Sequence, residues 1–180
     1  MTSFGVLLAQ DHSPAEVLDW ARRFDEAGAD SVWVADHLAN PFDVNSLWFD
    51  GWTLLAAMAV TTSRCRIGPL VSNFVLHSPL RMARLTTTLD GISNGRLNLG
   101  LGMGGASVCR SASSVYERVD FVAGTEPTNR QELAELVTRM SELGFDECIA
   151  TGWPPVGGPE RSIDELLAFV SEDLPALRSS

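Results

Sequence analysis

The sequence predicts an α/β fold in which helices cover a parallel sheet. Three observations lead to this prediction: short apolar runs alternate with longer segments of helical period, the apolar runs are nearly continuous, and helix-capping residues stand where the longer segments begin. Strands that are buried on both faces have continuous apolar sequences, and each crossover helix packs back onto the sheet. We therefore expect a series of βα units.

The first unit has a predicted strand at 4–9 and a helix that begins after Ser13. Pro14 and Glu16 complete a capping box with a first-turn proline, and Gly28 is suited to end the helix in a left-handed conformation. The units that follow have predicted strands at 31–35, 66–72 and 96–101, and predicted helices at about 52–62 and from Ser78-Pro79 onward.

The C-terminal part continues the same pattern after a connector at about 103–118, which is rich in Gly and Ser and has no strand or helix period. Its predicted elements are a strand at 119–123, a helix capped by Thr128 and Gln131 and ended by Gly144, a strand at 147–150, and a last helix capped by Ser162 and Glu165. This makes six strands, whereas a closed parallel βα barrel needs eight and about 250 residues. We predict a single domain over 1–180 that forms an incomplete, about six-stranded parallel βα barrel of TIM-barrel type.

Composition narrows the classes of partner. The formal net charge is −10, and the sequence contains no cluster of Lys and Arg that would form a positive patch. Nucleic acid and anionic membranes are therefore not expected partners. Cys65, Cys109 and Cys148 are odd in number and widely spaced, which predicts reduced thiols rather than disulfides or a metal site. With no signal-peptide pattern or membrane-spanning run, we expect a cytoplasmic protein.

Four segments of the chain carry a family resemblance. They are GADSVWVADH at 28–37, GWTLLAAMA at 51–59, RIGPLVS at 66–72 and TLDGISNGRLNLGLG at 88–102. In order and spacing they resemble the luciferase-like monooxygenase family of flavin- or F420-dependent oxidoreductases, and residues 143–178 resemble that family's final βα unit. The resemblance implies a shortened member in which the connector replaces the middle of the barrel.

Asp36 and His37 follow the second predicted strand, at the carboxyl end where βα folds place ligand groups. By the resemblance they are catalytic candidates beside the flavin or deazaflavin ring, where an imidazole could donate a hydrogen bond or shuttle a proton. The alternative is structural: Asp36 caps the following turn and His37 packs against Trp33 or Trp48.

Ser72 and Asn73 follow the third predicted strand, and by the resemblance they bind the cofactor at a non-proline cis peptide that supports the ring. The alternative is an ordinary loop in which Asn73 satisfies backbone groups. Gly102 and Gly104 are further cofactor-binding candidates, because small residues at a strand end let a ring or substrate approach. Their spacing matches no phosphate-loop motif, so a connector hinge is equally open.

Two other loops contain candidate residues. The family commonly has Arg-His-Pro where this chain has His77, Ser78 and Pro79, and Ser78 is the better helix N-cap, so capping is favoured over catalysis. The run WPPVGG at 153–158 follows the last predicted strand, where barrels often bind phosphate.

The resemblance therefore implies an oxidoreductase that uses FMN or coenzyme F420 to transfer hydride to or from a small organic substrate, with no metal. The usual phosphate site falls in the segment that the connector replaces. The alternative is a non-catalytic shortened relative that acts as a dimeric binding or structural protein. In either case an open sheet leaves edges that a second copy would cover, so we expect a homodimer.

Overall fold

The protein is described by a computed structural model over residues 2–41, 43, 45–74, 76–102, 129–151 and 163–179. The predicted connector at 103–118, the predicted strand at 119–123, and the predicted caps Thr128 and Ser162 lie outside the described residues.

The centre of the fold is a parallel four-stranded sheet in the order β3-β2-β1-β6. Its strands are β1 (Ser3–Leu7), β2 (Ser31–Val34), β3 (Arg66–Pro69) and β6 (Glu147–Thr151). A second parallel pair consists of β4 (Ser72–Asn73) and β5 (Leu101–Gly102). The register places Val6 beside both Val32 and Ala150, so the last strand returns to lie next to the first.

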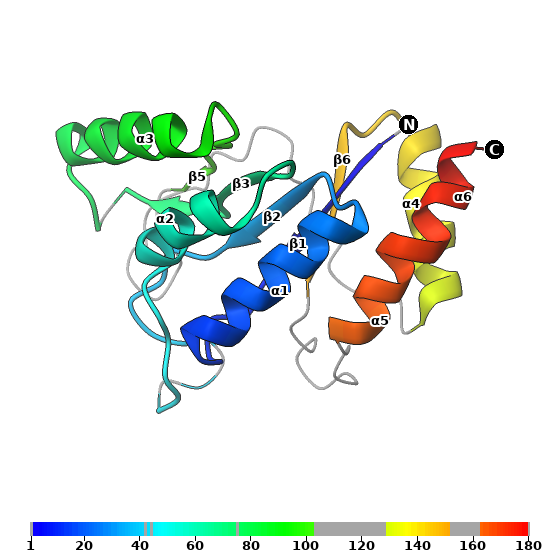
Figure 1. The fold of residues 1–180 in the computed structure, drawn as a ribbon, viewed down its shortest axis with the longest axis horizontal. Helices are drawn as coiled ribbons and strands as arrows, with labels where there is room; N and C mark the ends of the chain where they lie inside the picture. The colour runs from blue at the N-terminus through cyan, green and yellow to red at the C-terminus, as the bar shows by residue number, and fades with distance from the viewer. Residues whose placement is uncertain are drawn as a thin grey trace.

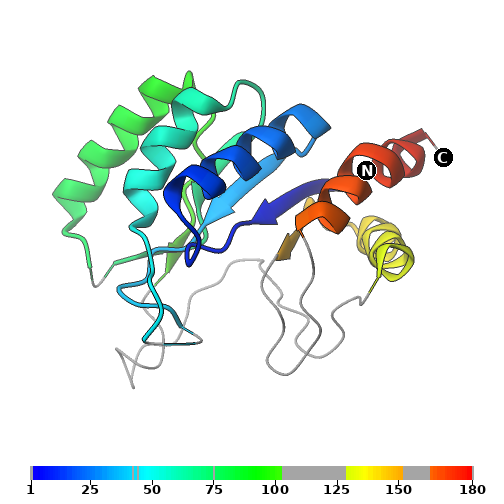
Figure 2. The ribbon, with the colours of Figure 1, turned by 60° about the horizontal axis from the view of Figure 1, so that its bottom comes forward.

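Helices cover one face of this sheet (Figures 1 and 2). They are α1 (Pro14–Ala27), α2 (Gly51–Thr61), α3 (Pro79–Ser93), α4 (Arg130–Glu142), α5 (Ile163–Ala168), the π-helical segment η1 (Phe169–Asp173) and α6 (Leu174–Ser179). Parallel strands, outer helices and a final strand beside the first are the arrangement of a βα barrel. Within the described residues the barrel is not closed, so the predicted fold class, an incomplete βα barrel of TIM type, is confirmed.

The helix starts follow local sequence. Ser13 and Glu16 form the predicted capping box of α1, and Gly28 ends that helix with φ of 110°. Ser78 caps α3 as predicted, whereas α4 is capped by Asn129 and not by Thr128, because Asn129 accepts the hydrogen bond from the Glu132 N–H. None of the helices in the described part of the chain is long and apolar enough to cross a bilayer.

Two predicted strands differ from the structure. The run at 66–72 is interrupted between β3 and β4 at Leu70 and Val71, whose peptide bond is cis. The run at 96–101 pairs only through a single bridge between Ile67 and Leu97 and then through β5. Apolar periodicity detects burial along a run but not a break in its pairing, so both predictions were too long.

Two charged side chains, the buried Asp25 and the partly buried Arg96, hold the loops that connect these elements. Asp25 on α1 is 6% exposed and accepts hydrogen bonds from the backbone N–H groups of Ser63, Arg64 and Cys65, at 2.8, 3.0 and 2.6 Å. The Arg96 guanidinium donates to the carbonyl oxygens of Ala59, Thr62, Cys65 and Ser93. Both anchor the turn between α2 and β3, and so fix where β3 and β4 begin.

Candidate functional site at the carboxyl ends of the strands

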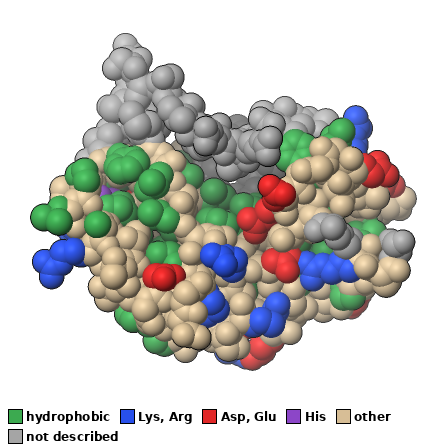
Figure 3. Space-filling model, turned by 90° about the horizontal axis from the view of Figure 1, so that it is seen from above, with side chains coloured by type: hydrophobic (Ala, Val, Ile, Leu, Met, Phe, Trp, Pro, Cys, Tyr) green, Lys and Arg blue, Asp and Glu red, His purple; other side chains and the backbone are tan. Residues whose placement is uncertain are grey.

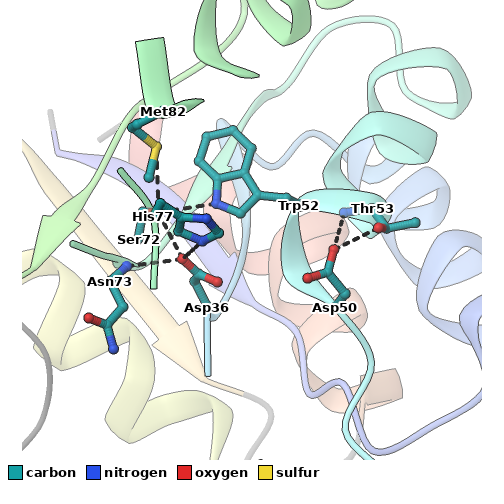
Figure 4. A network of polar contacts seen from close by, with 8 residues as sticks. All are labelled: Asp36, Asp50, Trp52, Thr53, Ser72, Asn73, His77 and Met82. Atoms are coloured by element: carbon teal, nitrogen blue, oxygen red, sulfur yellow. Dashed lines mark hydrogen bonds and ion pairs between the residues drawn. The ribbon is translucent and has the colours of Figure 1, made fainter. Parts of the chain in front are cut away.

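The site is centred on the Asp36 carboxylate, which is 5% exposed and lies just beyond β2. Its Oδ2 atom accepts hydrogen bonds from Ser72 Oγ at 2.8 Å and from the Asn73 backbone N–H at 3.0 Å. His77 Nε2 lies 2.8 Å from the same oxygen. Figure 4 shows these groups converging on one point. A buried carboxylate is costly unless it is paired, and here three polar groups compensate it.

Trp52, at the start of α2, forms one wall of this cluster. Its indole N–H donates to Ser72 Oγ at 3.1 Å, and its ring meets the His77 ring edge-on at a centroid distance of 6.3 Å. The position of Trp52 depends on the N-cap of α2, because Asp50 accepts a 2.7 Å hydrogen bond from the Thr53 N–H (Figure 4). The end of β2, the start of α2 and the end of β4 therefore converge in the cluster.

His77 is the member of the cluster that sequence reasoning missed. Only capping by Ser78 was favoured at this loop, and that capping is present: the Arg81 N–H donates to Ser78 Oγ. The His77 side chain is 11% exposed, and its Nδ1 atom is buried without a hydrogen-bond partner among the described residues. The position of His77 in the sequence could have predicted it as a site residue, because it follows β4 and side chains after neighbouring parallel strands meet at one edge of the sheet.

His37 lies outside the cluster although it adjoins Asp36 in sequence. It is exposed, and its ring meets Trp48 edge-on at 6.5 Å, which is the packing that the structural alternative anticipated. Partial desolvation lowers the pKa of His37, while the negative charge of Asp36 opposes this shift. The side chain of Asp36 is directed to Ser72, Asn73 and His77.

Gly102 pairs with Asn73 across β4 and β5. A Cβ atom at Gly102 would overlap the Val71 side chain, so close packing between these strands requires the glycine. The cis peptide expected near Ser72 and Asn73 lies immediately before them, between Leu70 and Val71. Gly104 and the loop at 153–158 lie outside the described residues.

Residues 1–121 match the model of the luciferase-like monooxygenase family. The chain belongs to this family. The 5,10-methylenetetrahydromethanopterin reductase of Methanopyrus kandleri is 31% identical over 102 residues, which are 57% of this chain and 27% of that protein. The F420-dependent glucose-6-phosphate dehydrogenase of Amycolatopsis mediterranei is 34% identical over 102 residues, which are 54% of this chain and 30% of that protein. The chain therefore spans about three tenths of the length of these relatives.

Two solved structures agree with this chain in fold. The F420-dependent tetrahydromethanopterin reductase of M. kandleri superimposes with a TM-score of 0.52 at 30% identity, covering 59% of this chain and 28% of that one. An F420-dependent secondary alcohol dehydrogenase superimposes with a TM-score of 0.53 over 78% of this chain and 42% of that one, at 23% identity, which shows the fold alone.

The ring of a flavin or deazaflavin is a planar heterocycle with polar edges, so its site needs both apolar and polar side chains. Leu38, Leu47 and Phe74 lie in the loops after β2 and β4 and are 79%, 71% and 40% exposed. The loops that follow β2 and β4 therefore contain both kinds of side chain. The described part of the chain has no group of three or more His, Cys, Asp or Glu side chains able to hold a metal ion. The cofactor-binding candidate Gly104 and the candidate phosphate site in the 153–158 loop fall outside the described residues.

Proposed function

We propose that the protein is a flavin- or F420-dependent oxidoreductase that transfers hydride to or from a small organic substrate. The observation that carries this proposal is the buried cluster of Asp36, Ser72, Asn73 and His77 at the carboxyl ends of the strands, together with exposed apolar side chains in the loops after β2 and β4. Two relatives have names that specify F420 or a reductase, which supports a redox role. The cofactor would supply the hydride chemistry, and the protein would orient it and exclude water.

Each site residue has a distinct proposed role. Asp36 holds β4 and the loop after it in place, so that Ser72 and Asn73, which make up β4, form the floor on which the ring rests. His37 stands at the rim, where its exposed imidazole donates to the ring or the substrate. Gly102 lets β5 lie close to this floor, and we place Gly104 among the cofactor-binding candidates on sequence alone. Partial desolvation lowers the pKa of His37, which favours the neutral imidazole.

Cofactor titration tests the proposal. We expect FMN or F420 to bind with a Kd of tens of micromolar or tighter, followed by the change in cofactor absorbance and fluorescence. His37→Ala should weaken binding or turnover about tenfold, a change of about 1.4 kcal/mol. His12→Ala is the matched control, because His12 contacts Asp11 and Trp20 and takes no part in the Asp36 cluster. If neither cofactor binds, the oxidoreductase proposal is wrong.

A homodimer forms the second part of the proposal. Leu80 and Ile92 on α3 and Val60 on α2 are 75%, 47% and 71% exposed. Figure 3 shows hydrophobic side chains gathered at the α3 end of the face seen from above. Exposed apolar patches of this kind mark interaction surfaces. Light scattering should give a mass of two chains; a mass equal to one 19.5 kDa chain contradicts it.

The same surface favours a second candidate, a dimeric binding or structural protein without catalysis. A dimeric mass together with no binding of FMN or F420 would support this candidate over the oxidoreductase.

A further inference from the structure

The directions of the hydrogen bonds around Asp36 can be assigned from donor chemistry. An indole N–H can only donate, so Ser72 Oγ accepts from Trp52 at 3.1 Å. The one hydrogen of the Ser72 hydroxyl is then directed to Asp36 Oδ2 at 2.8 Å, because its other neighbour, Met82 Sδ, lies 3.8 Å away and is a weak acceptor. The Asn73 backbone N–H also donates to Oδ2. Oδ2 is therefore an acceptor.

This assignment determines the tautomer of His77. His77 Nε2 lies 2.8 Å from Asp36 Oδ2, and a stable contact there requires a hydrogen on Nε2. In a neutral imidazole the second nitrogen then carries the lone pair. That nitrogen, Nδ1, is buried and has no hydrogen-bond partner among the described residues. A buried acceptor without a partner is costly, so a hydrogen-bond donor on a ligand would stabilise Nδ1.

We propose that His77 is the proton-accepting group of this site and that the substrate carries a hydroxyl group that is oxidised to a carbonyl. The inference rests on the proposed function. In the oxidation, the carbinol C–H bond gives its hydride to the bound flavin or deazaflavin, the O–H bond breaks, and a carbonyl forms. The released proton passes to Nδ1, directly or through one water. The reverse reaction returns this proton to the carbonyl oxygen.

Asp36 suits His77 to this role. The imidazolium that forms when Nδ1 is protonated keeps its Nε2–H bond to the carboxylate, which is 5% exposed and held by Ser72 and Asn73. His37 has no equivalent orientation: it is exposed and contacts the edge of Trp48. The geometry therefore favours His77 over His37 as the proton acceptor.

The tautomer can be measured without cofactor. Nitrogen NMR on the histidine-labelled full chain resolves three imidazoles, and the signal lost in His77→Gln identifies His77. We expect His77 to be the Nε2–H tautomer at neutral pH. His12 is an internal contrast, because its Nδ1 lies 2.9 Å from Asp11 Oδ1 and favours the opposite tautomer. An Nδ1–H tautomer at His77 overturns the inference even if the protein binds a cofactor.

Kinetics with the same variant separate proton transfer from positioning. The amide of His77→Gln can still donate to Asp36, but it has no basic nitrogen. We expect an unchanged cofactor Kd, within threefold, and a kcat with small alcohols lowered by about 100-fold or more. The pH profile of kcat should differ between the wild type and the variant, because a glutamine side chain does not ionise. A purely structural role would instead weaken cofactor binding and keep the pH profile.

The outcomes distinguish the two proposals. A wild-type protein that binds neither FMN nor F420 refutes the proposed function and, with it, the catalytic role of His77. A protein that binds cofactor but oxidises no alcohol and reduces no carbonyl overturns the substrate class. A variant kcat within threefold of wild type, with the same pH profile, overturns the assignment of His77.

Discussion

Asp25→Asn should destabilise the protein strongly, because Asp25 holds the turn that places β3 and the site beyond it. Burial raises the pKa of this carboxyl, but hydrogen bonds from Cys65, Ser63 and Arg64 outweigh burial and lower the pKa from 3.8 to about 2. At about 1.36 kcal/mol per pKa unit, this difference is about 2 kcal/mol of stability at neutral pH. In the variant an amide NH₂ replaces one acceptor oxygen and faces N–H donors, so we expect a loss of about 2–4 kcal/mol.

Urea unfolding, followed by tryptophan fluorescence, measures this loss. Since the folded pKa is depressed, the stability is present above pH 3.8 and is lost as the pH falls through about 2, so the difference between wild type and Asp25→Asn should shrink over this window. Asp19→Asn is the control: Asp19 forms an exposed pair with Arg22 on the same helix, and its loss should cost less than about 0.5 kcal/mol. A loss below about 0.5 kcal/mol for Asp25→Asn would refute the reasoning.

Three further substitutions test other contacts. Glu147→Gln should raise the stability of the protein at pH 7, because burial raises the pKa of Glu147 and the folded state favours the neutral form of the side chain. The gain in stability should disappear as the pH falls below 4.5, and thermal unfolding at several pH values measures it. Gly102→Ala should lower the free energy of unfolding in urea by about 1–3 kcal/mol, because the new Cβ would overlap the Val71 side chain. Gly91→Ala has open space around the new Cβ and should cause no loss of stability. Arg96→Lys should cost about 2 kcal/mol in the same assay, because one ammonium cannot replace a guanidinium that donates to four carbonyl oxygens.

Much of the fold could be predicted because it depends on local chemistry. The capping box at Ser13, the left-handed Gly28 and the cap at Ser78 are short-range features, and the structure has all three. Continuous apolar runs indicated a parallel sheet, and the family model that matches residues 1–121 agrees with the resemblance. The N-cap of α4 was wrong by one residue, because Thr128 and Asn129 are adjacent and both are good N-caps.

The arrangement of the site was less predictable because its contacts are long-range. The sequence predicts Asp36 and Ser72 as site residues independently, each from its position after a strand, and no sequence pattern indicates that they are in contact. The contact of Asp36 with His77 spans 41 residues, and the contact of Trp52 with Ser72 spans 20. Both depend on how far β4 continues beyond the interruption after β3, which periodicity does not determine.

The proposed function depends on the Asp36 cluster facing the cofactor. Mapping cofactor binding by NMR tests this placement most directly. Two N–H groups report from inside the cluster: the Asn73 backbone amide and the Trp52 indole. On addition of FMN or F420 to the labelled protein, we expect both signals to shift. The indole signal of Trp20, which lies on α1 and contacts His12, should not shift. Cofactor-induced shifts that leave Asn73 and Trp52 unchanged would contradict this placement of the cofactor.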